Sequence, residues 1–552
     1  MSPPTDIADR GLLRWIEESS PERGLRFTDG DDAWAFSSYA DLGRLALRVS
    51  AALRGRGIGE GDVVAIVQRS SPGFVASLFG TFSAGATACS IAPPVALQRL
   101  DDHVRHTTHL LATAEPALVV CDEESVAYAA GPLAALGMPA PVTFADLVDG
   151  VEPDEGPGRP GATALLQFTS GSSGSARGVR ISSGALRANI TAMRRWLGWE
   201  QPMPAISWLP VHHDMGLVGC LMNMVVTACD AHLMQPEDFV RSPLRYLRCI
   251  SDNRVSLGAM PNFGLRYLVR RVRPAQLDGL RFDALRGIIL GAERIDPDTL
   301  REVTALLGPY GFDERALLPA YGGAEATLAV TGVRPGTGWT TRAPGQGAPV
   351  VGCGTPLEGT TVTVVDDEGT ALPAGSVGEI VVSGPSVATE YVGRPGTASG
   401  TMITDGTLRT GDAGFLGEDG QLFVIGRLGD GLKVRGRMVF AEDLELELTG
   451  RGIPDRRAAV LLGVLGGVPT GVVVFENEKP GWSEIAAEVL REALDDARLL
   501  TVGVLRGGIA VTSSGKPRRR VMWAALGEEP AGARPLGTPL ITDQNRGEPV
   551  HA

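Results

Sequence analysis

The first 120 residues alternate between helical and strand-like spacing of apolar side chains. Ser38 and Asp41 are a pair typical of a helix N-terminus, and the apolar residues that follow recur at helical spacing, which predicts a helix that ends near Gly55. The run "VVAIV" from Val63 predicts a strand, "GFVASLFGTFSAGA" predicts a helix, and "ALVVCD" from Ala117 predicts another strand. Strand, helix and strand in this order are typical of a parallel sheet.

Three further apolar runs predict buried strands that lead directly into glycine. They are "ALLQFT" from Ala164, "GIILGAE" from Gly287 and "ALLPAYG" from Ala316. In open α/β sheets, ligands bind beyond the carboxyl ends of such strands. We therefore expect a ligand site where these runs end.

From about Thr361 the apolar spacing changes to a period of two. The segments "TVTVVD", "GEIVVSG" and "QLFVIGR" are separated by turn residues, which predicts a smaller β-rich unit. The glycine-spaced stretch "LGDGLKVRGR" follows Arg427, and we place a hinge there. A long helical pattern, "WSEIAAEVLREALDDARLL", begins at Trp482.

These elements predict an α/β protein in several parts, because 552 residues are too many for one core. We expect a large N-terminal domain of parallel α/β sheets with a small β-rich subdomain, followed by a small, mobile α+β C-terminal domain. The predicted boundaries are 1–428 and 429–527. Residues 528–552 are rich in proline and glycine, and we expect a disordered tail.

Composition excludes several classes of function. The net charge of −13 gives no basic face for nucleic acid. The longest apolar run, from Gly216, is shorter than the about 18 residues that a membrane span requires. No secretion signal is recognisable at the start, so we expect a cytoplasmic protein without a membrane partner. The six cysteines lack CxxC spacing, which argues against a disulfide framework and a zinc site.

Lysine is rare in this chain. Lys433, Lys479 and Lys516 are the three lysines among 51 basic residues, so nearly every other cationic position carries arginine. Chemistry that needs a compact ammonium on a flexible stem cannot be done by a guanidinium. Each remaining lysine is therefore a candidate for such chemistry.

The stretch "FTSGSSGSARGV", from Phe168 to Val179, predicts an anion site. Its glycines and serines leave backbone amides uncovered after a predicted strand, where an anion can be held. The stretch contains neither a Walker loop nor GxGxxG, and its one cation is Arg177.

Five segments in this order resemble the adenylate-forming ligases. They are "FTSGSSGSARGV", "WLPVHHDMGL", "PAYGGAEATL", "RTGDAGFL" and "TSSGKPRRR", with the hinge stretch between the last two. "WLPVHHDMGL" is similar to the fatty acyl-AMP ligase branch in particular. The resemblance spans nearly the whole chain and implies an enzyme that uses ATP and Mg²⁺.

The resemblance assigns roles to individual residues. Glu325 is the carboxylate on the side of Mg²⁺, Tyr321 is the ring that stacks on adenine, and Asp412 suits a ribose diol because one carboxylate accepts from two hydroxyls. Arg177 stands where the family usually has lysine and can still bind phosphate. The full set assigned to ATP is Thr169, Ser170, Gly171, Ser172, Ser173, Gly174, Arg177, Gly291, Ala292, Glu293, Tyr321, Gly322, Asp412 and Arg427.

Lys516 is the strongest candidate for catalysis. Joining a carboxylate to the α-phosphate of ATP brings two anions together, so cations are needed at that place. Three arginines follow Lys516 after Pro517, yet this position is lysine. The resemblance implies that Lys516 enters the site by rotation of the C-terminal domain about Asp430. A plain surface lysine is the alternative.

The resemblance implies that the segment around His213 lies on the side of the site that holds the acid. We assign His213 to catalysis and His212, His213, Asp214, Met215 and Gly216 to an acyl pocket, which the following apolar run could line. A core helix explains that run equally well. The chemical identity of the acid, whether fatty, polyketide, terpenoid or aromatic, and the oligomeric state are not predicted.

Three functions remain open at this point. The leading one activates a lipophilic carboxylic acid to acyl-AMP and transfers the acyl group to a phosphopantetheine thiol, for example of an acyl carrier protein. The second is a two-step ligase that uses coenzyme A, because the segment from Gly332 to Val351 is shorter than in fatty acyl-AMP ligases. The third is a homologue that binds a nucleotide or acyl group without catalysis, which Arg177 favours and the retained Glu325, Asp412 and Lys516 oppose.

Overall fold

The computed structural model describes most of the chain. The described residues are 11–29, 33–94, 100–169, 177–199, 203–344, 349–392, 401–434, 437–466, 468–494, 497–512, 515–526 and 534–535. The predicted phosphate-loop residues Ser170, Gly171, Ser172, Ser173 and Gly174 lie outside this set.

A seven-stranded sheet contains the first predicted strands. Its order is β20-β8-β7-β4-β3-β5-β6, and β7, β4, β3, β5 and β6 run parallel, which confirms the predicted parallel sheet. The strands are β3 (Val63–Val67), β4 (Thr87–Ser90), β5 (Leu118–Cys121), β6 (Val142–Thr143), β7 (Thr163–Phe168), β8 (Gly178–Ser182) and β20 (Glu390–Val392). The segment from 169 to 177 joins the antiparallel pair β7 and β8.

A nine-stranded sheet lies beside the first and is parallel in its centre. Its order is β17-β14-β13-β12-β11-β9-β10-β1-β2, with antiparallel pairs at both ends. The strands are β1 (Gly24–Asp29), β2 (Ala33–Ser38), β9 (Ala205–Ser207), β10 (Ala231–Leu233), β11 (Leu257–Met260), β12 (Gly287–Leu290), β13 (Leu317–Gly322), β14 (Ala329–Gly332) and β17 (Thr355–Pro356). The predicted strands that run into glycine are β7, β12 and β13.

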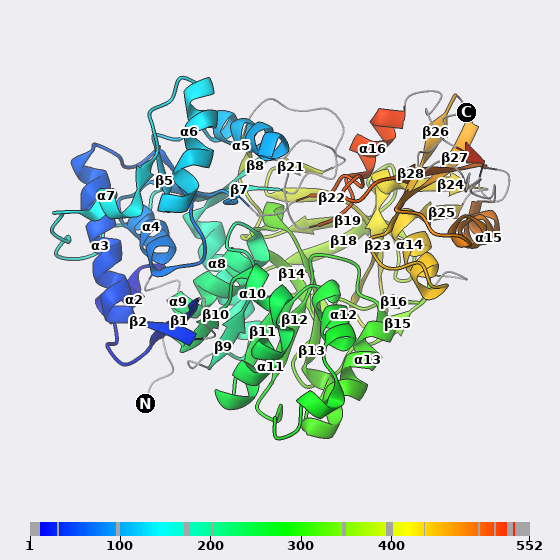
Figure 1. Ribbon diagram of the computed structural model, residues 1–552, viewed down its shortest axis with the longest axis horizontal. Coiled ribbons are helices and arrows are strands. Elements are labelled where there is room, and N and C mark those ends of the chain that lie inside the picture. Colours follow the sequence, from blue (N-terminus) through cyan, green and yellow to red (C-terminus); the bar gives the residue numbers. More distant parts are fainter. Residues whose placement is uncertain are drawn as a thin grey trace, which may run out of the picture.

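Helices cover these two sheets (Figure 1). The predicted first helix is α3, which begins at Tyr39 and ends at Gly55, and its cap is confirmed because the Asp41 amide donates to Ser38 Oγ over 3.1 Å. The helices of this part are α2 (Arg14–Glu17), α3 (Tyr39–Gly55), α4 (Pro72–Ser83), α5 (Leu100–Ala114), α6 (Val126–Ala135), α7 (Phe144–Val148), α8 (Ser183–Leu197), α9 (Asn223–Val226), α10 (Pro236–Arg241), α11 (Pro243–Asp252), α12 (Asn262–Arg271) and α13 (Pro297–Leu307).

Short helical turns complete this region. The apolar run from Gly216 folds as a buried π-helix that continues into α9. The turns are η1 (Glu123–Ser125), η2 (Met215–Met222, the π-helix), η3 (Pro274–Gln276), η4 (Gly308–Tyr310), η5 (Glu314–Ala316) and η6 (Ala324–Ala326). None of the described helices combines the length and apolar character needed to cross a membrane. The six cysteines are buried free thiols.

The region with period-two spacing forms an antiparallel five-stranded sheet, as predicted. Its strands are β18 (Thr361–Val365), β19 (Gly378–Ser383), β21 (Met402–Thr404), β22 (Thr407–Leu416) and β23 (Leu422–Arg427), and the small pair β15 (Thr341–Arg342) and β16 (Val350–Val351) precedes it. Alternate residues Val362, Ile380 and Val382 are buried in one cluster, which explains the spacing.

The chain beyond Arg427 forms the yellow to red elements at one end of the molecule (Figure 1). They are η7 (Leu428–Asp430), β24 (Gly431–Val434), β25 (Arg437–Phe440), α14 (Ala441–Gly450), β26 (Ala458–Leu465), β27 (Val468–Glu476), α15 (Trp482–Leu494), β28 (Arg498–Val504), α16 (Arg519–Leu526) and β29 (Arg534–Pro535). Two cores pack on the two faces of the β26-β27-β28-β29 sheet. The mixed α/β class is therefore confirmed, while the domain boundaries at 428 and 527 and the mobility of the last domain stay predictions.

The helix predicted from Trp482 is longer than the helix that the structure contains. The helix α15 ends at Leu494, and Arg498–Val504 is the strand β28, paired parallel with β27. Leu500 is buried in the same cluster that Val502 and Val504 pack against, so the apolar spacing of this segment has a period of two. In the predicted tail, Arg534–Pro535 pair with β28, and the other residues of 528–552 lie outside the described set.

Candidate active site

A cavity of about 1480 Å³ lies at the carboxyl ends of β12 and β13. Its walls come from the two large sheets, the five-stranded sheet and the segment around Lys516. The predicted site residues that line it are Thr169, Arg177, His212, His213, Asp214, Met215, Gly291, Ala292, Glu293, Tyr321, Gly322, Glu325, Asp412, Arg427, Asp430 and Lys516. The fold thus brings together segments that are up to 347 positions apart in the sequence, from Thr169 to Lys516.

Asp412 lies between a tyrosine and an arginine. The hydroxyl of Tyr321, at the end of β13, donates to Asp412 Oδ2 over 2.6 Å. Nε of Arg427, at the end of β23, lies 3.0 Å from Asp412 Oδ1. The charge of Asp412 raises the pKa of Arg427 above its ordinary value, and burial raises the pKa of Tyr321, so both groups keep their protons and remain donors.

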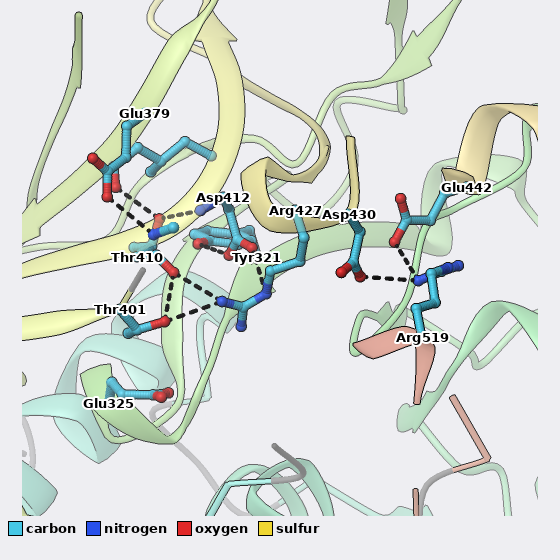
Figure 2. A network of polar contacts seen from close by, with 12 residues as sticks. Tyr321, Glu325, Glu379, Thr401, Thr410, Asp412, Arg427, Asp430, Glu442 and Arg519 are labelled. Atoms are coloured by element: carbon cyan, nitrogen blue, oxygen red, sulfur yellow. Dashed lines mark hydrogen bonds and ion pairs between the residues drawn. The ribbon is translucent and has the colours of Figure 1, made fainter. Parts of the chain in front are cut away.

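Neighbouring strands hold this group in place (Figure 2). Arg427 Nη1 donates to Thr401 Oγ1 over 3.1 Å and to the Thr410 carbonyl over 3.0 Å. The Asp412 amide donates to Thr410 Oγ1 over 3.0 Å, and the amide of the preceding Gly411 donates to Glu379 Oε1 over 3.1 Å. Because the network is formed largely within one sheet, the Asp412 carboxylate has a fixed position at the cavity wall.

The ends of the predicted phosphate loop also border the cavity. The Thr169 amide donates to the Arg177 carbonyl over 3.0 Å and closes the β7–β8 connection. Nη2 of Arg177 lies 4.0 Å from Oε1 of Glu325, and its guanidinium carbon lies 3.8 Å from the ring centre of Tyr391. The loop cation and the predicted metal-side carboxylate are therefore neighbours, with Tyr391 beside them.

Glu325 can serve as one protein ligand of Mg²⁺. The described residues contain no group of three His, Cys, Asp or Glu side chains that could hold a metal ion by themselves. Mg²⁺ is usually bound by one or two carboxylates together with substrate phosphates and water, so a single carboxylate beside a phosphate site fits it. Glu325 has 13% of its side chain exposed and faces the cavity.

Lys516 reaches the cavity from a tight turn. The Thr512 amide donates to the Lys516 carbonyl over 2.8 Å, and the chain turns at Gly515, whose φ of 82° favours glycine. Burial lowers the pKa of Lys516, whereas the carboxylates of Glu293, Asp214 and Asp412 act in the opposite direction. An ammonium in such a place strongly favours anionic partners.

Glu293 joins the strand end of β12 to the segment that carries Lys516. Its Oε1 accepts the Phe263 amide over 2.5 Å, and its Oε2 lies 3.7 Å from Nη2 of Arg456. Burial raises the pKa of Glu293, and the charges of Arg456 and Lys516 oppose this. The preceding Ala292 has a φ of 66°, an uncommon conformation for a residue with a side chain.

Further ion pairs connect the two sides of the predicted hinge. Arg266 lies 3.3 Å from Asp455, and Arg294 pairs with Asp443. Arg266 also lies 2.7 Å from Asp296, on its own side of the hinge. The guanidinium of Arg456 also lies 4.2 Å from the ring centre of Phe263. These contacts are present in the same arrangement of the chain in which Lys516 lies inside the cavity.

The predicted hinge residue Asp430 is 5% exposed. Its Oδ2 accepts from Nη1 of Arg519 in α16 over 3.2 Å, and Arg519 also binds Glu442 of α14 (Figure 2). Arg519 binds Glu445 of the same helix as well. Burial raises the pKa of Asp430, although Arg519 opposes this. The hinge is thereby tied to the elements that follow it.

The predicted acyl segment is placed beside Lys516. Nδ1 of His213 lies 2.7 Å from Oδ1 of Asp214. Burial disfavours the Asp214 carboxylate, but His213, the Met215 amide and Lys516 together favour it, and the pKa of Asp214 is lowered. Burial lowers the pKa of His212 to about 3, with a contribution from His106 of α5, so His212 is a neutral group in the cavity wall.

Gly216 is the one residue of the predicted acyl pocket that does not line the cavity, although the structure describes all five of them. A Cβ at this position would lie 2.2 Å from the Pro210 carbonyl oxygen, so glycine is needed for close packing of the chain. Gly219, three residues farther along the π-helix, lines the cavity instead.

An apolar part of the cavity extends beyond His213. Its wall combines side chains of α8, the π-helix, α9, β9, β11 and β12. The apolar lining residues there are Met193, Trp196, Trp199, Ile206, Met215, Cys220, Met224, Leu257 and Ile289. The run from Gly216 therefore forms both core and cavity wall.

Three residues of the site were not found from the sequence. Tyr391 donates to Glu325, Thr401 binds Arg427, and Arg456 binds Glu293. The arginine bias of the chain hides Arg456 among many others. The one sequence signal for Tyr391 was weak: it is one of seven tyrosines in the chain.

The fold and the site together define an adenylate-forming enzyme. Comparison with known families matches residues 19–392 to the AMP-binding enzymes. The chain therefore belongs to the AMP-binding enzyme family, and the resemblance to the adenylate-forming ligases is confirmed.

Relatives and solved structures agree with this class. The chain is similar to a 4-hydroxyphenylalkanoate adenylyltransferase of Mycobacterium tuberculosis, with 32% identity over 83% of this chain and 81% of the relative. It is also similar to the putative fatty-acid–CoA ligase fadD25 of the same species, with 30% identity over 92% and 96%. A structure from work on the fatty acyl-adenylate ligases of E. coli and L. pneumophila matches with a TM-score of 0.85 and 26% identity, over 94% of this chain and 98% of that one.

Proposed function

We propose that this protein joins a lipophilic carboxylic acid to the α-phosphate of ATP, releases pyrophosphate, and transfers the acyl group from acyl-AMP to a phosphopantetheine thiol. The observation that carries the proposal is the position of Lys516. It lines the same cavity as Asp412 and Arg427, although it comes from the far end of the chain.

In this proposal Tyr321, Asp412 and Arg427 bind the nucleoside. The Asp412 carboxylate accepts hydrogen bonds from the ribose hydroxyls, and Arg427 holds that carboxylate and faces phosphate oxygens. The ring of Tyr321 stacks on the adenine. Gly291, Ala292 and Gly322 supply main chain at the strand ends, where nucleotides bind in open α/β sheets.

The loop from Thr169 to Arg177 binds the leaving pyrophosphate in the same proposal. Arg177 contributes charge at one end of the loop and Glu325 contributes a carboxylate for Mg²⁺. When bound, Mg²⁺ neutralises phosphate charge and orients the leaving group. The loop residues from Ser170 to Gly174 stay predictions.

Lys516 stabilises the reacting oxygens. In the first step a carboxylate oxygen of the acid attacks the α-phosphorus, and the bond from that phosphorus to the pyrophosphate oxygen breaks. An ammonium beside both anions offsets their repulsion and the charge of the transition state. His213, held by Asp214, lies at the junction with the apolar part of the cavity and orients the carboxylate.

The second step transfers the acyl group to sulfur. The thiol attacks the acyl carbon, AMP leaves, and the thiol proton passes to solvent. Rotation about Asp430 would withdraw Lys516 and open the site to the thiol. The names of the relatives cover both an adenylyltransferase and a fatty-acid–CoA ligase, so coenzyme A is the second candidate acceptor.

The acid is lipophilic in this proposal because sulfur and aromatic side chains line the inner cavity. Trp196, Trp199 and Met224 offer apolar surface to an alkyl chain or an aryl ring. The adenylyltransferase relative is named for 4-hydroxyphenylalkanoates, and this class belongs among the acids to be tested.

The experiment is ATP–pyrophosphate exchange with a panel of fatty, arylalkanoic and small polar acids. We expect exchange with lipophilic acids and little with small polar ones. Exchange with none of them would favour a binding protein without catalysis. Coenzyme A and a phosphopantetheinylated carrier protein, offered side by side, then identify the acceptor by the thioester that forms.

A further inference from the structure

Tyr391 lies between the two charged groups of the predicted phosphate side. Its hydroxyl donates to Glu325 Oε1 over 2.9 Å. Its ring faces the Arg177 guanidinium, whose central carbon lies 3.8 Å from the ring centre. Arg177 and Glu325 themselves are 4.0 Å apart, too far for a hydrogen bond, so the tyrosine provides the closer link.

We propose that Tyr391 is a positioning residue for metal-bound ATP, which orients Glu325 toward Mg²⁺ and holds Arg177 toward the pyrophosphate part. This inference rests on the proposed function, because it assumes that ATP binds in this cavity. It assigns Tyr391 a role that acts through its two neighbours.

The hydroxyl determines how Glu325 can bind. It occupies Oε1 as a donor and leaves Oε2 for another ligand. A carboxylate fixed by one hydrogen bond loses less freedom when it binds a cation.

The ring explains why arginine can stand at position 177. A planar guanidinium can lie flat on an aromatic face while its N–H groups point outward at the edge, whereas an ammonium is a compact charge. Arg177 Nη1 also donates to the Thr401 carbonyl over 3.4 Å. The guanidinium is thus held on its face and at its edge.

The backbone places Tyr391 at this point independently of its side chain. Strand β20 pairs antiparallel with β8, and Tyr391 lies opposite Val179, two residues after Arg177. Just before β20, the Ala388 amide donates to the Glu325 carbonyl over 2.8 Å. The same short segment therefore joins the strand of Arg177 to the turn of Glu325.

Two substitutions separate the hydroxyl from the ring. Tyr391→Phe removes the hydrogen bond to Glu325 and keeps the stack on Arg177, whereas Tyr391→Leu removes both. Tyr267→Phe is the matched control, because the Tyr267 hydroxyl donates to the Val240 carbonyl over 2.7 Å in an exposed place outside the cavity.

The measurement is calorimetric binding of ATP without any acid, once with saturating Mg²⁺ and once with a chelator. For Tyr391→Phe we expect the dissociation constant of MgATP to rise about tenfold, because a hydrogen bond to a charged group is lost, and that of metal-free ATP to stay as in the parent. For Tyr391→Leu we expect both constants to rise. Tyr267→Phe should change neither.

The inference is overturned if Tyr391→Phe binds MgATP like the parent, or if it weakens MgATP and metal-free ATP by the same factor, as a general structural defect would. A parent that binds no ATP overturns it together with the proposed function. A parent that binds ATP but exchanges pyrophosphate with no acid contradicts the proposed function alone, because the Tyr391 experiment contains no acid.

Discussion

The Tyr321 hydroxyl and the Asp412 carboxylate are joined by a hydrogen bond of 2.6 Å, although 91 positions separate them in the sequence. Tyr321 ends a strand of the nine-stranded sheet and Asp412 lies in the five-stranded sheet, so the bond connects two structural units. With Arg427 on the other carboxylate oxygen, Asp412 is fixed at the cavity wall.

Asp412→Ala should remove recognition of the ribose. We expect ATP to bind more weakly, by about tenfold or more, because the variant lacks the carboxylate that accepts hydrogen bonds from the two ribose hydroxyls. The sharper measurement compares ATP with its 2′-deoxy and 3′-deoxy analogues. The parent should prefer ATP, and Asp412→Ala should bind all three alike. A variant that still discriminates would contradict the assignment of Asp412.

Arg456→Ala should weaken the arrangement that brings Lys516 into the cavity. Arg456 faces Glu293 and lies on the ring of Phe263, so its loss removes two contacts across the predicted hinge. We expect adenylate formation to slow severalfold, while transfer from supplied acyl-AMP to a thiol is not slowed. Arg491→Ala, on an exposed residue of α15, is the control and should change neither step. Equal slowing of both steps by Arg456→Ala would contradict this role.

His212 predicts a pH effect on stability. Its pKa is about 3 in the folded protein and 6.5 without the fold, so below pH 6.5 the unfolded chain binds a proton that the folded protein does not. Stability from this group is present above pH 6.5 and is lost as the pH falls toward 3, by about 1 kcal/mol for each pH unit. Between pH 7 and pH 5, the free energy of unfolding measured in urea should therefore fall less for His212→Phe than for the parent. The same slope in both proteins would contradict the neutral state of His212.

The main helices and strands could be predicted from the sequence because each has a local signal. The helix from Tyr39 has its cap, β3 has its apolar run, and the five-stranded sheet has its period of two. The end of α15 was misplaced because "ARLL" fits a helix by composition. Its leucines instead join a strand whose partner β27 is fixed by tertiary pairing.

The candidate site was predictable where chemistry restricts the residue type. Lys516 was recognisable because lysine is rare in this chain, and Asp412 and Glu325 because their segments resemble those of the adenylate-forming ligases. Gly216 was misjudged because a glycine needed for packing against Pro210 looks like one that borders a ligand. Tyr391 was missed because its two partners come from distant strands and turns, which no local pattern reveals.

The central claim is that Lys516 supplies the charge that allows the acid and the α-phosphate to react. The most direct measurement is the single-turnover rate of acyl-AMP formation by Lys516→Ala, with ATP binding measured alongside and Lys479→Ala, an exposed lysine of the same part of the chain, as the control. We expect Lys516→Ala to form acyl-AMP at least about 100-fold more slowly, with ATP affinity close to that of the parent, and Lys479→Ala to be unchanged. Equal rates of acyl-AMP formation in Lys516→Ala and the parent would contradict the claim.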